Sequence, residues 1–213
     1  MARSDPQDRH SQRELSGFAG FLGARVAALR WDDLPREAVQ WAKVGILDTV
    51  GVTLAGSREE APRLLASALD PAPGPSLIFG TSRRVGVLDA AYVNGTASHA
   101  LDFDDCSNTM GGHPSVPVLS ALFPLADELG VSGRDFVLAY IAGFEVETKI
   151  ALAVNFHHYT KGWHPTATLG TFGSAAACGH LLGLSADQLA NALALAASMA
   201  SAVAVRRASS RRR

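Results

Sequence analysis

The sequence predicts an all-α protein, a multi-helix bundle of about eight helices. Apolar residues recur at intervals of three and four along most of the chain, which is the spacing of one helix face. Prolines at helix starts, glycines at helix ends and Ser-x-x-Asp or Ser-x-x-Gln boxes divide the chain into segments of helical length. Only residues 76–80, SLIFG, are typical of a strand.

The first half of the chain predicts three helices behind a polar start. Residues 1–13 are polar, and we expect them to be disordered. A helix is expected over residues 14–29, and a better marked one from Pro35 to Gly56, because proline favours the first helical position and glycine the end. A third helix, over residues 60–69, should end at the proline-rich stretch that follows.

The second half predicts five more helices. They are expected over residues 87–101, 114–129, 132–154 and 168–182, and from Ser185 onward, with Ser-x-x-Asp and Ser-x-x-Gln boxes opening the third and the last. Gly, Ala and Ser dominate residues 168–182, and such small side chains let helix axes approach closely. We therefore expect this helix at the centre of the bundle.

Composition excludes several classes of protein. The 213 residues are 47% hydrophobic and 18% charged, with a formal charge of −1, which does not indicate nucleic acid or an anionic membrane as partner. The N-terminus lacks the apolar core of a signal peptide, and polar residues interrupt the Ala-rich run 189–205. Two cysteines, Cys106 and Cys178, are too few for a disulfide framework, so we expect a cytoplasmic protein.

Titratable side chains concentrate in residues 93–115, VNGTASHALDFDDCSNTMGGHPS. This otherwise small and apolar stretch contains His99, Asp102, Asp104, Asp105 and His113. A second, thinner cluster follows at residues 161–166, KGWHPT. Imidazole and carboxylate groups change protonation on either side of neutrality, as general acid–base catalysis needs. We predict that the two clusters meet and form most of one half of an acid–base active site.

His113 and His164 each precede a proline that can begin a helix. Exposed N–H groups and the helix dipole at such a position favour an anionic ligand. Asp102 would orient a neighbouring imidazole and support its cationic form. If the two helix starts converge, they suit a substrate with several carboxylates.

Two other interpretations remain open from the residues alone. One is a metal-dependent hydrolase that holds a divalent ion with His99, Asp102, Asp105 and His113. We favour a site without metal, because the stretch contains no tight His pair such as His-x-x-x-His. The other is a non-catalytic helical remnant that only dimerises. Of Glu145 and Glu147, at most one can face inward, and surface charge is the default for both.

Several motifs together resemble the MmgE/PrpD family. They occur in the family's order and spacing as NGT 94–96, HALDFDD 99–105, HPS 113–115, GFE 143–145, GWHPT 162–166 and LLGLSADQLANALALAAS 181–198. The family includes 2-methylcitrate dehydratase, cis-aconitate decarboxylase and iminodisuccinate epimerase. The resemblance implies a helical domain completed by later chain, a smaller α+β lid, an active site between them, homodimers, and no iron–sulfur cluster or other cofactor.

The resemblance also implies a reaction and residue roles. Members move a proton next to a carboxylate of a di- or tricarboxylate, so the chain is expected to be a carbon–oxygen lyase similar to 2-methylcitrate dehydratase, with decarboxylation or epimerisation as variants. By position, His113 is the main acid–base group and Asp102 its partner or a substrate contact. His164 binds a carboxylate or transfers a proton. Cys106, also in the substrate-binding set, stands where the decarboxylases place threonine, which disfavours that identity.

The chain departs from the family after Ala200. Where members continue with a lysine-containing motif and the lid, this sequence reads SAVAVRRASSRRR. We therefore expect residues 14–201 to be an incomplete helical domain without the lid, and residues 202–213 to be a basic tail unrelated to the fold. Such a truncated chain is expected to have little or no turnover on its own.

Overall fold

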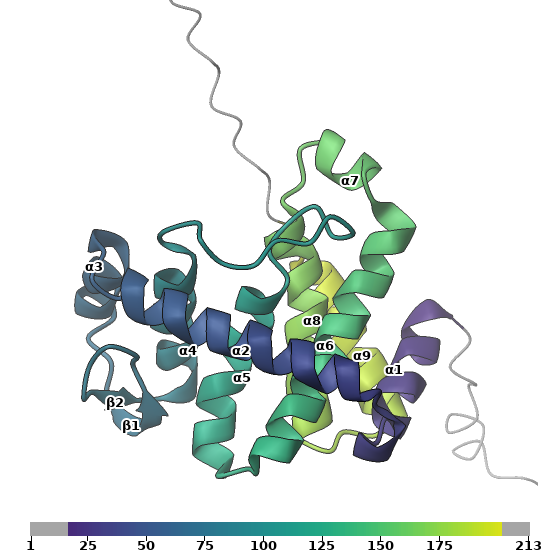
Figure 1. The fold of residues 1–213 in the computed structure, drawn as a ribbon, viewed down its shortest axis with the longest axis horizontal. Helices are drawn as coiled ribbons and strands as arrows, with labels where there is room; N and C mark the ends of the chain where they lie inside the picture. The colour runs from purple at the N-terminus through teal and green to yellow at the C-terminus, as the bar shows by residue number, and fades with distance from the viewer. Residues whose placement is uncertain (1–16, 202–213) are drawn as a thin grey trace, which may run out of the picture.

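The computed structural model describes residues 17–201, and within them the all-α prediction is confirmed (Figure 1). The predictions for residues 1–13 and 202–213 lie outside the described residues. The helices are α1 Phe18–Ala28, α2 Arg36–Gly56, α3 Glu60–Leu69, α4 Val87–His99, α5 Ser115–Leu129, α6 Gly133–Val154, α7 His157–Thr160, α8 Pro165–Leu181 and α9 Ala186–Met199. A 3-10 turn, Trp31–Asp33, and the four-residue α7 fill segments where no helix was expected.

Helix α8 is the centre of the bundle, as its small side chains predict. It packs against α1, α5, α6 and α9, most extensively against α6, and Figure 1 shows α6 and α8 side by side. A Cβ atom built at Gly143 on α6 would lie 2.5 Å from the carbonyl oxygen of Gly173 on α8. The two backbones therefore approach closely because neither helix carries a side chain at this point.

Replacing Gly143 with alanine should destabilise the fold by about 1–3 kcal/mol, because a backbone carbonyl cannot move aside as a flexible side chain would. Gly51→Ala is the matched control, since its position on α2 is exposed and a Cβ there meets nothing within 4 Å. There, alanine should be neutral or slightly stabilising. Urea unfolding of both variants measures the difference, and equal stabilities would contradict this packing.

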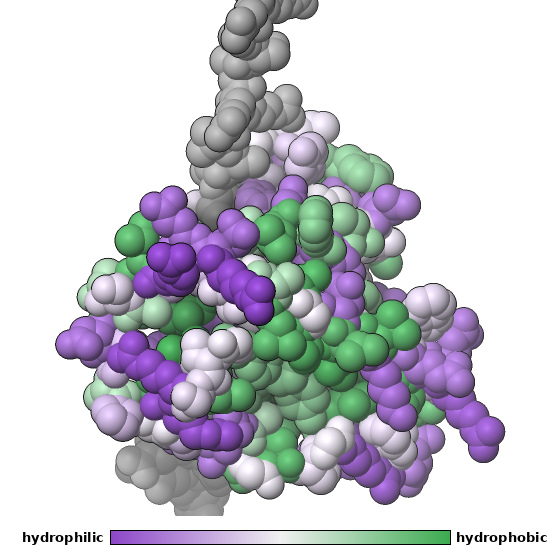
Figure 2. Space-filling view, turned by 60° about the vertical axis from the view of Figure 1, so that its left-hand side comes forward, coloured by the Kyte–Doolittle hydropathy of each residue, from purple (hydrophilic) through white to green (hydrophobic). Residues whose placement is uncertain are grey.

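Long helix α2 crosses the front of the bundle and packs against α4, α5 and α6 (Figure 1). Its outer face exposes large apolar side chains, among them Trp41, Val44 and Leu47. In Figure 2 apolar residues form a broad area on the face shown. The described part of the molecule thus exposes several large apolar side chains along α2.

The strand prediction is correct in kind but wrong in position. Strand β1 spans Pro73–Leu77 and pairs antiparallel with β2, Arg84–Val85, rather than covering residues 76–80. Prolines are compatible with a strand in a two-stranded sheet, where one edge needs no donors. The side chain of buried Asn94 on α4 accepts from the Phe79 amide and donates to the Leu77 carbonyl, at 2.9 Å each, and so fixes the hairpin to the bundle.

The capping boxes begin their helices as expected. The Ser185 hydroxyl accepts from the Gln188 amide and the Gln188 side chain accepts from the Ser185 amide, a complete box at α9. At α6 the Ser132 hydroxyl accepts from the Asp135 amide at 3.2 Å. Among the helices of residues 17–201, none has both the length and the apolar character needed to cross a bilayer.

Candidate active site

The segment between α4 and α5 lies against the start of α8, so the structure brings the two predicted clusters together. The His113 amide donates to the Thr166 hydroxyl at 2.9 Å. Gly112 allows this approach, because a Cβ there would lie 2.8 Å from the same hydroxyl oxygen. Met110 is fully buried in the core, and the Ser107 amide donates to the Gly112 carbonyl at 2.9 Å. The segment is therefore held at both ends and in the middle.

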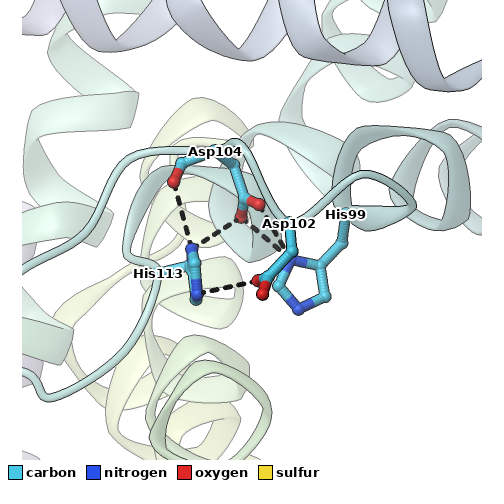
Figure 3. A group of neighbouring side chains, drawn as sticks. All are labelled: His99, Asp102, Asp104 and His113. Atoms are coloured by element: carbon cyan, nitrogen blue, oxygen red, sulfur yellow. Dashed lines mark hydrogen bonds and ion pairs between the residues drawn. The ribbon is translucent and has the colours of Figure 1, made fainter.

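Asp104 joins two imidazoles at the centre of this segment (Figure 3). Its side chain is fully buried, and His99 Nδ1 donates to its carboxylate at 2.9 and 3.0 Å. His113 Nδ1 lies 3.2 Å from Asp104 Oδ2 and 3.1 Å from the Asp104 backbone carbonyl. The sequence analysis assigned no role to Asp104, although it stands in the DFDD motif.

These contacts fix the orientation of the His113 ring. A carbonyl oxygen can only accept, so His113 Nδ1 carries a hydrogen and donates to it. Nε2 then points to Asp102, whose Oδ1 lies 3.3 Å away. Asp102 is 77% exposed and His113 16%, so this pair is at the surface end of the cluster.

Asp102 reaches this position through a backbone that the sequence analysis did not anticipate. Helix α4 ends at His99, and Asp102 adopts a left-handed conformation with φ 56°. The expected helix over residues 87–101 therefore ends two residues earlier than predicted, at His99. Aspartate tolerates this conformation better than most residues, and the turn redirects its side chain toward His113.

His164 occupies the position just before the first residue of α8, without a side-chain capping bond, and completes the predicted set. Its ring centroid lies 6.3 Å from that of His99, which is 4.8 Å from that of His113. Burial lowers the pKa of His164, and the neighbouring His99 and His113 lower it further. The hydrogen bond to Asp104 raises the pKa of His99. His164 thus favours the neutral form, while His99 holds its proton more strongly.

Cys106 and Asp105 lie beside the cluster in different ways. Cys106 Sγ is 3.7 Å from His113 Nδ1, and desolvation together with the Asp104 and Asp105 carboxylates raises the pKa of the thiol. Cys106 is therefore a neutral, weak donor near neutrality. Asp105 turns away, because its carboxylate accepts from both the amide and the hydroxyl of Ser115 at the start of α5.

The candidate metal ligands consequently differ from the predicted set. In the described part of the chain, one ligand atom each from His99, Asp102, Asp104 and His113 lies within 4.8 Å of the others. Asp104 replaces Asp105 in this group, because Ser115 engages the Asp105 carboxylate. Nothing in the sequence distinguishes the two adjacent aspartates in this respect.

A cavity of about 530 Å³ lies next to this cluster, between α2 and α6. Its walls include Trp41, Phe144 and Tyr140, together with the carboxylates of Asp48 and Asp105. Oδ2 of Asp48 is buried without a hydrogen-bond partner among the described residues. Acidic walls would repel an anion, so the cavity does not suit the carboxylate ligand that the helix N-termini favour.

Of Glu145 and Glu147 on α6, Glu147 is the one that faces inward, against the default expectation of surface charge. Its side chain is fully buried, and neither carboxylate oxygen has a partner among residues 17–201. Burial raises the pKa of Glu147 well above its usual value, so the fold favours the protonated form of this carboxyl. Surface charge, the default expectation, holds for Glu145, which lies 3.5 Å from Lys149.

This burial predicts a pH dependence of stability. A raised pKa in the folded state makes the folded chain hold a proton that the unfolded chain releases, so stability falls as pH rises above the usual glutamate pKa. The slope from one such group is about 1.4 kcal/mol per pH unit. Glu147→Gln should remove this slope and Glu145→Gln should keep it. Urea unfolding at pH values from about 5 to about 8 measures how the free energy of unfolding of each variant depends on pH. Identical slopes in the two variants would contradict the assignment.

Together, fold and site define a helical domain with a cluster of imidazoles and carboxylates beside two helix N-termini. The chain belongs to the MmgE/PrpD family, because the model of the MmgE/PrpD N-terminal domain matches residues 21–212. This confirms the family suggested by the motifs.

Curated relatives agree with the family assignment. Cis-aconitate decarboxylase of Homo sapiens is 34% identical over 196 residues, 88% of this chain and 40% of that protein. The enzyme of the same name from Aspergillus terreus is 32% identical over 194 residues, 87% of this chain and 39% of its own. A probable 2-methylcitrate dehydratase of Saccharomyces cerevisiae is 28% identical over 176 residues, which are 75% of this chain and 33% of that protein. The chain thus spans about 40% or less of these relatives.

Proposed function

We propose that this chain carries part of the active site of a lyase that acts by acid–base catalysis on a small di- or tricarboxylate. The main support is the His113 ring, whose Nδ1 is occupied by Asp104 while Nε2 faces Asp102 at the exposed end of the cluster. A ring held in one orientation with one nitrogen near solvent is the arrangement that a general acid or base requires. Relatives named as a decarboxylase and a dehydratase support a lyase.

In this proposal His113 Nε2 exchanges the proton with the carbon next to a substrate carboxylate. Asp102, which lies beside that nitrogen, stabilises the protonated imidazole or contacts the substrate. His164 and the N-terminal amides of α8 bind a substrate carboxylate, since a helix N-terminus favours an anion. Cys106 lines the same side of His113 and is a weak donor to the substrate.

Two reactions fit these roles. In dehydration the proton and a hydroxyl group leave neighbouring carbons, and in decarboxylation carbon dioxide leaves while a carbon gains a proton. The residues of the cluster are the same for both reactions, so the substrate decides between them. We propose 2-methylcitrate and cis-aconitate as the first substrates to test, because relatives are named for both reactions.

The test is an assay of the purified chain with each substrate, with and without a chelator. We expect saturable binding and low turnover that the chelator does not change. Turnover that requires an added metal ion would instead support the hydrolase interpretation, and absence of any binding would support the non-catalytic remnant. Low turnover is expected because water weakens electrostatic stabilisation in an open site.

The homodimer and the cytoplasmic location stay predictions. The apolar outer face of α2, with Trp41, Val44 and Leu47, is the surface that we propose for contact with a second copy. Sedimentation velocity of the chain and of its Trp41→Lys variant tests this. A monomeric wild-type chain, or a dimer that the substitution leaves unchanged, would contradict it.

A further inference from the structure

The ligand atoms of His99, Asp104, His113 and Asp102 form a continuous row. His99 Nδ1 lies 2.9 Å from Asp104 Oδ1, His113 Nδ1 lies 3.2 Å from Asp104 Oδ2, and His113 Nε2 lies 3.3 Å from Asp102 Oδ1. Zinc bonds of about 2.0–2.2 Å in a tetrahedral site place ligand atoms roughly 3.3–3.5 Å apart. A single ion can bind only one nitrogen of His113, so the Nδ1–Asp104 and Nε2–Asp102 contacts cannot both serve it. The His99–Asp104 and His113 Nε2–Asp102 separations are the two that are already near those of a zinc site.

We propose that these four residues form a binding site for a divalent transition-metal ion, Zn²⁺ in particular, which takes the place of the protons that now join them. One ligand atom from each residue lies within 4.8 Å of the others, so small side-chain rotations close the set. Two carboxylates and two neutral imidazoles carry a formal charge of −2, which the ion balances.

Burial supports a preformed site with an entry path. The Asp104 side chain is fully buried and is held from both sides by imidazoles, so the inner ligand does not need to be ordered when the ion binds. Asp102 is 77% exposed and His99 34%, which leaves the outer ligands accessible from solvent. Asp102 can swing onto an arriving ion without disturbing a helix, because α4 ends before it.

The mixed ligand set also predicts selectivity. Imidazole nitrogens suit zinc, cobalt and nickel, whereas Mg²⁺ and Ca²⁺ prefer six or more oxygen ligands. We therefore expect Zn²⁺ to bind in the presence of excess Mg²⁺. Co²⁺ should bind at the same place and report a low-coordinate geometry in its visible spectrum.

The consequence for catalysis rests on the proposed function. In this site the ion binds His113 Nε2, since Nδ1 donates to the Asp104 carbonyl. A nitrogen that binds an ion has no free electron pair for a proton, so bound Zn²⁺ would block His113 as an acid or base. Zinc should then inhibit the lyase and a chelator should restore it. If the chain were instead a metal-dependent hydrolase, the same ion would raise its activity.

Calorimetric titration of the full chain with Zn²⁺ tests the site without any activity readout, so its failure is separate from failure of the proposed function. We expect one ion per chain and a loss of affinity of at least about tenfold in Asp102→Asn and in His99→Ala. Asp102→Asn keeps the test valid if His99→Ala misfolds, since Asp102 is largely exposed. His157→Ala, on exposed α7 outside the cluster, is the matched control.

Binding that both cluster variants lose and His157→Ala keeps would support the site. Absence of saturable Zn²⁺ binding would overturn it. Equal affinity in the wild-type chain and in Asp102→Asn and His99→Ala would also overturn it, because the ion would then be bound elsewhere on the surface.

Discussion

Replacing His113 with alanine is expected to lower turnover of the carboxylate substrate by about 10²- to 10⁴-fold, the usual contribution of a positioned general acid or base. The ring is held through Nδ1 by Asp104, and no other imidazole of the described residues has a nitrogen 3.3 Å from Asp102. His99 is not expected to replace it, because among the ion pairs of the described residues its ring contacts Asp104 and not Asp102. The measurement is kcat/KM with cis-aconitate and with 2-methylcitrate.

His157→Ala is the control for this experiment, since His157 is exposed on α7. It should keep the wild-type rate and the wild-type circular dichroism spectrum. If His113→Ala turned over substrate as fast as the wild-type chain, the assignment of the acid–base group would be refuted.

Replacing Asp104 with asparagine should cause a loss of similar size, about 10²- to 10⁴-fold, through a different route. The substitution keeps the shape but offers one acceptor and adds an amide donor, so the rings of His99 and His113 cannot both keep their hydrogen bonds. Asp104 is a positioning residue in this account, because it acts through the imidazoles.

A titration separates this role from simple destabilisation. The hydrogen bond to Asp104 raises the pKa of His99, so Asp104→Asn should lower it, as followed by NMR of the ring. Asp105→Asn is the matched control, because Asp105 bonds Ser115 at the start of α5. It should reduce stability and leave the titration of His99 nearly unchanged. An unaltered His99 titration in Asp104→Asn would contradict the positioning role.

Much of the fold could be predicted because its signals are local. Proline, glycine and capping boxes set the helix limits, and the small side chains of α8 predicted its central place, which Gly143 and Gly173 confirm. The strand expected over residues 76–80 begins earlier, at Pro73, because the sequence analysis interprets the prolines before it only as breakers. In a two-stranded sheet they are tolerated, since one edge of each strand is unpaired.

The arrangement inside the site depended on contacts between distant segments. The left-handed turn at Asp102 sends adjacent aspartates in different directions, Asp104 to the imidazoles and Asp105 to Ser115. No periodicity in the sequence encodes that division. Surface charge was only the default expectation for Glu147, whereas the glycines of α8 leave space for it in the core.

The central claim is that His113, Asp102 and His164 contact one small carboxylate molecule, and NMR of the histidine rings during a cis-aconitate titration tests it most directly. We expect the ring signals of His113 and His164 to shift together with one dissociation constant, while those of His157 stay constant. Asp102→Asn should change that constant. Saturation that shifts only one of the two rings, or neither, would contradict a shared site.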